Sequence, residues 1–314
     1  MLNNIGTAAP FGDRLSEAVA ARESQILLGL DPDPGALWPD ALSAADSAHG
    51  SSPEAKASAA VTEHCRLVIE ATAESCVGVK LQLASFERLG PSGRKSLGDV
   101  VRLAKEAGLL VLADGKRGDI GISASSYAAS LMGTTQTPWG EAAGLGADAV
   151  TVNPLLGAET VQPFIDVARA HGCGVFVLAR TSNPGAADIQ DQPLEVGGTV
   201  SDALARMVEG LGQGSIGSSG IADVGAVVGA TVPGHLAQLR ELMPTAPILL
   251  PGVGAQGGKV EDLAPAFSPG RAGGLITVSR SIVGAAGDSV DGHAAAAASA
   301  ASKLRELAWG LSAS

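Results

Sequence analysis

The chain repeats one local pattern eight times over its 314 residues. Each repeat begins with a short apolar run rich in leucine and β-branched residues, and amphipathic stretches separate most of these runs. The runs are continuous rather than alternating, which is typical of parallel strands that are covered on both faces. They lie at residues 26–30, 76–83, 109–113, 148–152, 174–179, 224–229, 247–251 and 274–278.

Helices are indicated between the runs, most clearly over residues 53–74 and 93–107. In the first of these, Val61, Cys65 and Val68 are spaced to share one buried face. Eight strands that alternate with helices favour a (β/α)8 TIM barrel, a parallel eight-stranded barrel with outer helices, over an open doubly wound sheet. The remaining helices are expected at 12–24, where one would close the barrel floor, and at 122–132, 158–171, 194–210, 234–242 and 289–309.

No stretch has the composition of an interdomain linker, so we expect residues 1–314 to form a single domain. Two segments are rich in small residues and read as flexible insertions within that domain. The first is the Ala/Ser-rich segment 43–60 and the second is the Gly/Ser-rich segment 210–223. Neither composition carries a functional signal.

Charge and composition exclude several classes of partner. The formal net charge is −11, from 32 acidic and 21 basic residues, which argues against a broad nucleic-acid-binding surface. No apolar run approaches the roughly 18 residues that cross a bilayer, and the N-terminus lacks the features of a secretory signal. Cys65, Cys76 and Cys173 form neither metal-type pairs nor an even disulfide set. We therefore expect a cytoplasmic protein without a membrane or nucleic-acid partner.

Polar side chains follow almost every apolar run at its C-terminal end. In a barrel of parallel strands these ends share one rim, which is where active sites of this fold lie. The residues that reach this rim are Asp31, Lys80, Asp114 to Asp119, Asn153, Thr181 to Asn183, Gly252 to Gly257, and Ser279 with Arg280.

The segment Asp114-Gly115-Lys116-Arg117-Gly118-Asp119 is the densest of these groups. On an extended strand end, Asp114 and Lys116 point the same way because side chains repeat every two residues. Lys80 on the neighbouring strand reaches the same mouth, which gives a Lys–Asp–Lys chain that Asp119 can extend. Each ammonium group then lies beside a carboxylate and stays charged. The alternative is a structural ion pair at a strand end.

The loop from Gly252 to Gly257 fits the pattern G-x-G-x-x-G. It does not belong to a first βαβ unit, and residues 263–287 contain no acidic residue to hold a ribose, so a dinucleotide site is disfavoured. We interpret the loop as a phosphate cradle. Its donors are the backbone N–H groups from Gly252 and Val253 onward, the Gln256 amide and the Arg280 guanidinium. A plain tight turn is the alternative.

Motifs for other chemistries are absent from the sequence. The five histidines have no metal-ligand spacing, and neither G-x-S-x-G nor H-E-x-x-H occurs. We therefore expect neither a metal nor an organic cofactor.

Four motifs together resemble the orotidine 5′-phosphate decarboxylase family, in particular its bacterial subgroup of longer chains. They occur in the family's order and cover about residues 12–283, with Gly29-Leu30-Asp31 and Val79-Lys80 in support. The D-x-K-x-x-D core belongs to a wider superfamily, whereas KRGDIG combined with PGVGAQGG is more specific. The motifs are VLADGKRGDIG (111–121), VLARTSNPG (177–185), LLPGVGAQGG (249–258) and TVSRSIV (277–283).

The resemblance implies conversion of orotidine 5′-monophosphate (OMP) to UMP and CO2 in de novo pyrimidine biosynthesis, without a cofactor. It implies that Lys116 is the proton donor and that Lys80, Asp114 and Asp119 complete the charge network. The family places the second aspartate of the motif in the partner's site, so Asp119 implies a homodimer with shared active sites.

The resemblance also implies a set of substrate contacts. Asp31 and Ser123 would lie at the ribose, with Ser123 also near the phosphate, and Ser182 would contact the pyrimidine. Gln256 and Arg280 would hold the phosphate. Four positions depart from the family pattern. Gly115 stands where alanine or another small residue is common, and Leu81 follows Lys80 where proline is frequent. Leu155 replaces the aromatic residue often found after Asn153-Pro154, and Ser279 stands where glycine is common.

Two other functions are compatible with the same scaffold. Metal-dependent sugar-phosphate synthases or decarboxylases share D-x-K-x-x-D but need a further carboxylate for Mg²⁺. A non-catalytic nucleotide-binding barrel is also possible in principle, because a fold does not imply a function.

Overall fold

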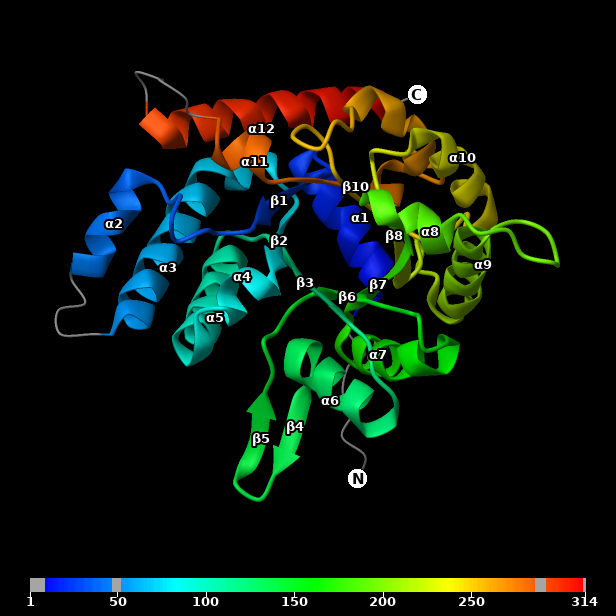
Figure 1. The fold of residues 1–314 in the computed structure, drawn as a ribbon, viewed down its shortest axis with the longest axis horizontal. Coiled ribbons are helices and arrows are strands. Elements are labelled where there is room, and N and C mark those ends of the chain that lie inside the picture. Colours follow the sequence, from blue (N-terminus) through cyan, green and yellow to red (C-terminus); the bar gives the residue numbers. More distant parts are fainter. Residues whose placement is uncertain (1–8, 47–51, 286–291, 313–314) are drawn as a thin grey trace.

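The computed structural model describes residues 9–46, 52–285 and 292–312. Eight parallel strands form a closed barrel in the order β1-β10-β9-β8-β7-β6-β3-β2, with helices around it (Figure 1). This confirms the (β/α)8 barrel, and every predicted run contains a strand. The barrel strands are β1 (Ile26–Leu30), β2 (Gly78–Gln82), β3 (Leu110–Arg117), β6 (Ala149–Val152), β7 (Gly174–Arg180), β8 (Val224–Val228), β9 (Ile248–Pro251) and β10 (Gly274–Val278).

The longer helices follow the predicted pattern, with differences at their ends. They are α1 (Phe11–Arg22), α2 (Pro39–Asp46), α3 (Pro53–Thr72), α5 (Gly90–Glu106), α6 (Gly121–Met132), α7 (Ala158–His171), α9 (Val200–Gly212), α10 (Pro233–Leu242) and α12 (Gly292–Leu311). Short helical turns are α4 (Leu83–Glu87), α8 (Ala187–Gln190), α11 (Arg280–Val283) and the 3-10 segments Ala73–Ser75, Pro184–Ala186, Gln213–Ser215, Val260–Phe267 and Arg271–Gly273. Residues 289–291 of the last expected helix lie outside the described residues.

Helix α9 begins six residues later than the predicted span 194–210. The reason is a turn in which Leu194 N donates to Gly198 O, with Gly198 at φ 77°. Thr199 then caps the helix, because its side chain accepts from Asp202 N while the Asp202 carboxylate accepts from Thr199 N. This reciprocal capping box fixes the helix start.

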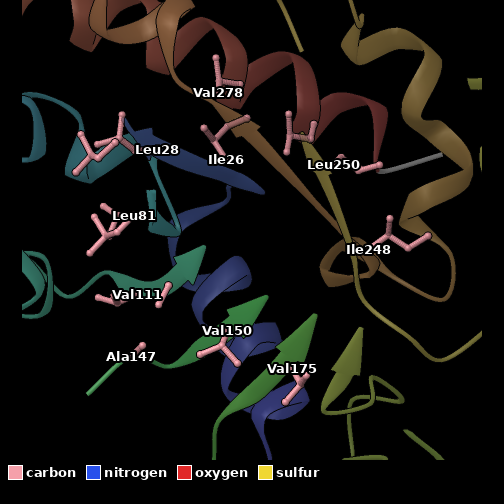
Figure 2. Packing of buried hydrophobic residues seen from close by; sticks show 14 of the residues in the cluster. Ile26, Leu28, Leu81, Val111, Ala147, Val150, Val175, Ile248, Leu250 and Val278 are labelled. Atoms are coloured by element: carbon pink, nitrogen blue, oxygen red, sulfur yellow. The ribbon is translucent and has the colours of Figure 1, made fainter. Parts of the chain in front are cut away.

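Two apolar layers explain why the strand sequences are continuous. Successive side chains on a strand face opposite ways. One set, which includes Leu27, Leu112 and Phe176, packs inside the barrel with Phe11 and Leu15 of α1. The other set packs between the strands and the outer helices and includes Ile26, Leu28, Leu81, Val111, Val150, Val175, Ile248, Leu250 and Val278, which Figure 2 shows together with Ala147 just before β6. Helix α1 therefore closes the barrel floor, as the sequence predicted.

A short antiparallel hairpin, β4 (Thr134–Thr137) with β5 (Gly140–Ala143), follows α6 and was not predicted. It projects from the barrel beside α6 (Figure 1), and Trp139 in its turn is 92% exposed. Its strands are polar and only four residues long. Such strands leave no periodic apolar signal in the sequence.

The two segments expected to be insertions are largely regular. Residues 43–46 belong to α2 and residues 53–60 to α3, while 47–51 lie outside the described residues. In the segment 210–223, the backbone N–H groups of Ser218 and Ser219 donate to the Asp13 carboxylate at 3.1 and 2.8 Å. Flexibility of these segments and the single-domain organisation stay predictions. None of the described helices combines the length and apolar character needed to span a membrane.

Candidate active site

A cavity of about 700 Å³ opens at the C-terminal rim of the barrel. Side chains from all parts of the rim line it, including most residues that the sequence singled out. The predicted residues in its wall are Asp31, Lys80, Asp114, Lys116, Ser182, Gly252, Val253, Gln256 and Arg280. The structure therefore brings together groups that lie up to about 250 positions apart in the chain, as expected for an active site of this fold.

A chain of opposite charges crosses the cavity wall. Lys80 Nζ lies 2.9 Å from Asp114 Oδ2, and Lys116 Nζ lies 2.7 Å from Asp114 Oδ1. Asp31 Oδ1 approaches Lys80 Nζ from the other side at 3.6 Å. The predicted Lys–Asp–Lys arrangement is present, with Asp31 at its end.

Burial and attraction between opposite charges have opposite effects on the pKa values of Lys80 and Asp114. Lys80 is 6% exposed and Asp114 is 5% exposed. Burial alone would lower the pKa of Lys80, but attraction to Asp114 and Asp31 outweighs it and raises that pKa. Burial alone would raise the pKa of Asp114, yet Lys80 and Lys116 bring it down to about 2. Both groups are therefore charged at neutral pH, because each lies beside an opposite charge that favours its ionised form.

Lys116 reaches Asp114 from an irregular strand end rather than from the regular strand that the two-residue repeat assumed. Its φ is 45°, and the pairing of β3 with β6 shifts register between Ala113 and Arg117. Thr151 on β6 supports this bend, because its Oγ1 accepts from Lys116 N at 2.9 Å and donates to Asp114 Oδ1 at 2.8 Å. The sequence analysis missed Thr151 as a site residue, since it lies inside an apolar run.

The glycine loop after β9 is a compact turn beside this ion chain. Gly252, Gly254 and Gly257 have φ values of 108°, 77° and 93°, so each occupies backbone space that favours glycine. Gln256 Oε1 accepts a hydrogen bond from Ser182 Oγ at 3.1 Å. The residues expected at the phosphate and at the pyrimidine therefore meet directly across the cavity.

Asp119 and Ser123 lie elsewhere. They line a separate, more open hollow of about 400 Å³ on α6, together with Ile122 and Tyr127. The Asp119 carboxylate accepts from Ile120 N at 2.8 Å. Within one subunit Asp119 does not line the cavity that holds Lys80, Asp114 and Lys116, so its extension of that network stays a prediction that depends on a partner subunit.

The loop after β7 is held in place by groups that sequence reasoning did not select. Arg180 donates to both carboxylate oxygens of Asp191 at 2.7 and 2.9 Å. Thr181 N donates to Gln190 Oε1 at 2.8 Å. These contacts fix the segment that carries Ser182. A bidentate Arg–carboxylate pair gives both attraction and a fixed geometry.

Within the described residues, no three His, Cys, Asp or Glu side chains are grouped as they would be to hold a metal ion. Asp31 and Asp114 are instead directed at lysines.

Residues 24–295 match the model of the "Orotidine 5'-phosphate decarboxylase / HUMPS family". The chain belongs to this family. The resemblance found in the sequence is thereby confirmed, while the finer assignment to a bacterial longer-chain subgroup stays a prediction.

Named members of the family are similar over most of their length. The chain is 40% identical to "Orotidine 5'-phosphate decarboxylase" of Rhodopirellula baltica, over 87% of this chain and 88% of that protein. It is 41% identical to the protein of the same name from Deinococcus radiodurans, with the same coverage. Among solved structures, Leishmania donovani OMP decarboxylase has a TM-score of 0.72 and 31% identity, covering 97% of this chain and 99% of that chain.

At two positions that depart from the pattern of orotidine 5′-phosphate decarboxylases, the neighbouring residues accommodate the change. A Cβ on Gly115 would lie 2.6 Å from Leu83 Cδ1, so Leu83 fills the space of the missing methyl group. A Cβ on Gly29 would lie 1.9 Å from Ser279 Oγ, so Gly29 leaves room for the Ser279 hydroxyl. The extra side chain at Ser279 is thus accommodated against β1.

Proposed function

We propose that the chain decarboxylates OMP to UMP and CO2 as a carboxy-lyase of de novo pyrimidine biosynthesis, without a cofactor. Family membership and the relatives' names support the substrate. The observation that carries the proposal is the charged Lys80–Asp114–Lys116 chain in the wall of the rim cavity.

The reaction requires stabilisation of negative charge on carbon. When the bond from C6 to the carboxyl carbon breaks, CO2 leaves and the electron pair stays on C6 as a vinylic carbanion. Fixed cations in a site that excludes water are the strongest means of lowering the energy of such a transition state. The Lys116 ammonium supplies this charge and then transfers a proton to C6. The neutral amine regains its proton from solvent after UMP forms.

Asp114 and Lys80 keep this cation in place. Asp114 holds one lysine on each carboxylate oxygen, so neither ammonium has to reorganise during the reaction. Asp114 would also face the departing carboxylate. Preorganisation of this kind lowers the barrier because the protein dipoles and charges are already oriented in the ground state.

The rest of the cavity suits the nucleotide. Arg280, the Gln256 amide and the backbone N–H groups of Gly252 and Val253 would bind the phosphate, and Ser182 would contact the pyrimidine. Asp31 would accept from the ribose. Phosphate binding far from C6 can then contribute to catalysis by organising the charged site.

We further propose a homodimer in which Asp119 and Ser123 enter the partner's site. Large apolar side chains are exposed next to Asp119 in the chain, where Ile120 and Ile122 are 64% and 87% exposed, and in the loop after Asn153, where Leu155 and Leu156 are 77% and 52% exposed. Exposed apolar side chains of this kind are typical of a face that another chain covers. Mixing Asp119→Ala with Lys116→Ala chains should restore one active site per hybrid dimer, and no recovery of activity would contradict the sharing of sites.

A cytoplasmic location is the last part of the proposal. Cys65, Cys76 and Cys173 are all buried and unpaired, as in proteins kept in a reducing compartment.

The proposed reaction is tested by following the ultraviolet absorbance change of OMP with purified protein, in buffer that contains EDTA and no cofactor. We expect full turnover with UMP as the product. Activity that is lost with EDTA and restored by Mg²⁺ would support a metal-dependent sugar-phosphate enzyme of the same superfamily instead. Tight UMP binding without any turnover would indicate a non-catalytic nucleotide-binding barrel.

A further inference from the structure

Thr151 lies between two groups of β3 that the proposed reaction uses. It is 1% exposed and sits on β6, directly beside the end of β3. Its hydroxyl hydrogen goes to Asp114 Oδ1 at 2.8 Å, and its oxygen accepts from Lys116 N at 2.9 Å. A single hydroxyl therefore joins the central carboxylate to the backbone of the lysine that is the proposed proton donor.

The backbone at Lys116 needs such a support. Its φ of 45° lies in the left-handed region, which residues other than glycine seldom occupy. Outside the regular strand pairing, the Lys116 N–H would have no ladder partner, and Thr151 supplies one. Positive-φ residues persist only where the surroundings hold them.

The hydroxyl also has a task during the proposed proton transfer. Once the Lys116 ammonium gives a proton to C6, its hydrogen bond to Asp114 Oδ1 weakens because the donor is no longer charged. Thr151 Oγ1 continues to donate to that same oxygen, while Lys80 holds Oδ2. The carboxylate thus keeps its orientation through the step in which one of its partners changes charge.

We propose that Thr151 is a positioning residue for the decarboxylation, which sets the geometry of Asp114 and Lys116 through its one hydroxyl. This inference rests on the proposed function. Thr151 lines the same cavity, and its hydroxyl acts through its two neighbours because it is engaged with Asp114 and with Lys116 N.

The test compares Thr151→Val, which keeps the shape and removes the hydroxyl, with Thr151→Ser, which keeps the hydroxyl. We expect Thr151→Val to lower kcat by about 10- to 100-fold, the size of effect that small misplacement of reacting groups produces. The KM for OMP and the Kd for UMP should change by less than about threefold, since the nucleotide contacts are untouched. Thr151→Ser should keep kcat within about threefold of the parent protein, because the hydroxyl that orients both groups remains.

A matched control is Thr72→Val in α3. Thr72 is also 1% exposed, and its hydroxyl donates to Val68 O within its own helix. The control should lose stability by a similar amount, measured as a change in Tm, while kcat stays at the parent value. A loss of kcat in the control equal to that in Thr151→Val would overturn the inference, because the effect would then be one of general stability.

A further pair of variants decides the matter if Thr151→Val does not fold. Thr151→Ala and Thr151→Ser both lack the methyl group and differ only in the hydroxyl. A lower kcat for Thr151→Ala than for Thr151→Ser supports the inference, and equal kcat values overturn it. If Lys116→Ala is inactive while Thr151→Val has normal kcat, only the role of Thr151 fails. If Lys116→Ala is active, the proposed role of Lys116 fails, and if the parent protein does not decarboxylate OMP, the proposed function itself fails.

Discussion

The two ends of the barrel both bury charge, but they compensate it in different ways. At the floor, Asp148 just before β6 accepts from Arg14 at 2.6 Å and from Val111 N at 2.9 Å. Asp223 just before β8 accepts from Arg169 at 2.7 and 3.2 Å. At the rim, by contrast, the ion chain lines a cavity of about 700 Å³.

Arg240 makes the contrast sharper. This buried guanidinium near the barrel floor donates to four backbone carbonyls, of Met243, Ala246, Ala266 and Gly273. Burial lowers the pKa of Arg240 to about 10, and Glu209 opposes that shift. At the floor, protein groups supply the partners of Asp148, Asp223 and the two terminal nitrogens of Arg240, so these residues stabilise the fold. The charges at the rim are left facing the space that a ligand would fill.

The largest expected effect of a substitution is at the rim. Lys116→Ala should lower kcat by at least about 10⁴-fold, because it removes both the cation and the proton donor. Binding of UMP, measured by calorimetry, should largely survive, and Tm should change little. Turnover near that of the parent protein would contradict the proposed role of Lys116.

At the floor we expect Arg169→Leu to lower stability and to leave catalysis unchanged, which is the reverse of the outcome for Lys116→Ala. Loss of its guanidinium leaves the Asp223 carboxylate, which is 3% exposed, without its charge partner. Removal of one partner from a buried pair costs about 3 kcal/mol or more of unfolding free energy. The folded fraction should keep the parent kcat. Urea unfolding measures the loss of unfolding free energy.

Arg102→Leu is the control for this floor substitution. Arg102 pairs with Glu106 on the surface of α5, with 59% of each side chain exposed. Such exposed pairs contribute about 0.5 kcal/mol. If Arg102→Leu lowered the unfolding free energy as much as Arg169→Leu does, burial would not explain why the Arg169–Asp223 pair stabilises the protein.

A smaller effect, confined to binding, is expected for Arg280→Ala. Loss of a charged hydrogen-bond donor to the phosphate should raise the KM for OMP by about 10- to 100-fold. Arg280 is exposed, so Tm should stay within about 2 °C of the parent value. Unchanged kinetics would show that the phosphate binds elsewhere.

The last predicted effect concerns acid stability, which we assign to His64 rather than to the rim. Burial first, and His293 second, lower the pKa of His64 to about 4. Since the unfolded state binds a proton near pH 6.5, this depressed pKa makes stability fall as the pH drops from 6.5 toward 4. The loss between pH 7 and pH 5 should be about 2 kcal/mol.

His64→Asn tests this assignment. The Asn side-chain oxygen can accept from Trp38 N as His64 Nδ1 does at 3.1 Å. The difference in unfolding free energy between pH 7 and pH 5 should then shrink by about 2 kcal/mol. An unchanged difference would place the acid-sensitive group elsewhere. Asp114, with its pKa of about 2, stays ionised throughout this range.

Sequence patterns predicted those features that depend on one strand at a time. Runs such as 26–30 and 224–229 revealed strands because both faces of each strand are buried. Lys80 and Asp114 were found because each occupies a strand end, and parallel strand ends share one rim.

Sequence patterns did not predict features that depend on how one strand pairs with its neighbour. Thr151 matters only because β6 lies beside the irregular end of β3, which no local pattern reveals. Asp119 follows a turn at Gly118, where the backbone passes so close to Asn153, just after β6, that a Cβ on Gly118 would lie 2.8 Å from Asn153 O. The hairpin β4–β5 is too short and too polar to produce a periodic signal.

Chemical rescue at position 116 tests the central claim most directly. Lys116→Cys, alkylated with 2-bromoethylamine, regains a side chain that ends in a primary ammonium. The native cysteines Cys65, Cys76 and Cys173 are buried, so the reagent should modify the new thiol selectively in the folded protein. The account predicts a protein that is inactive before alkylation and decarboxylates OMP after it. Full modification with intact UMP binding but no activity, or equal activity before and after alkylation, would contradict the claim that the Lys116 ammonium carries the reaction.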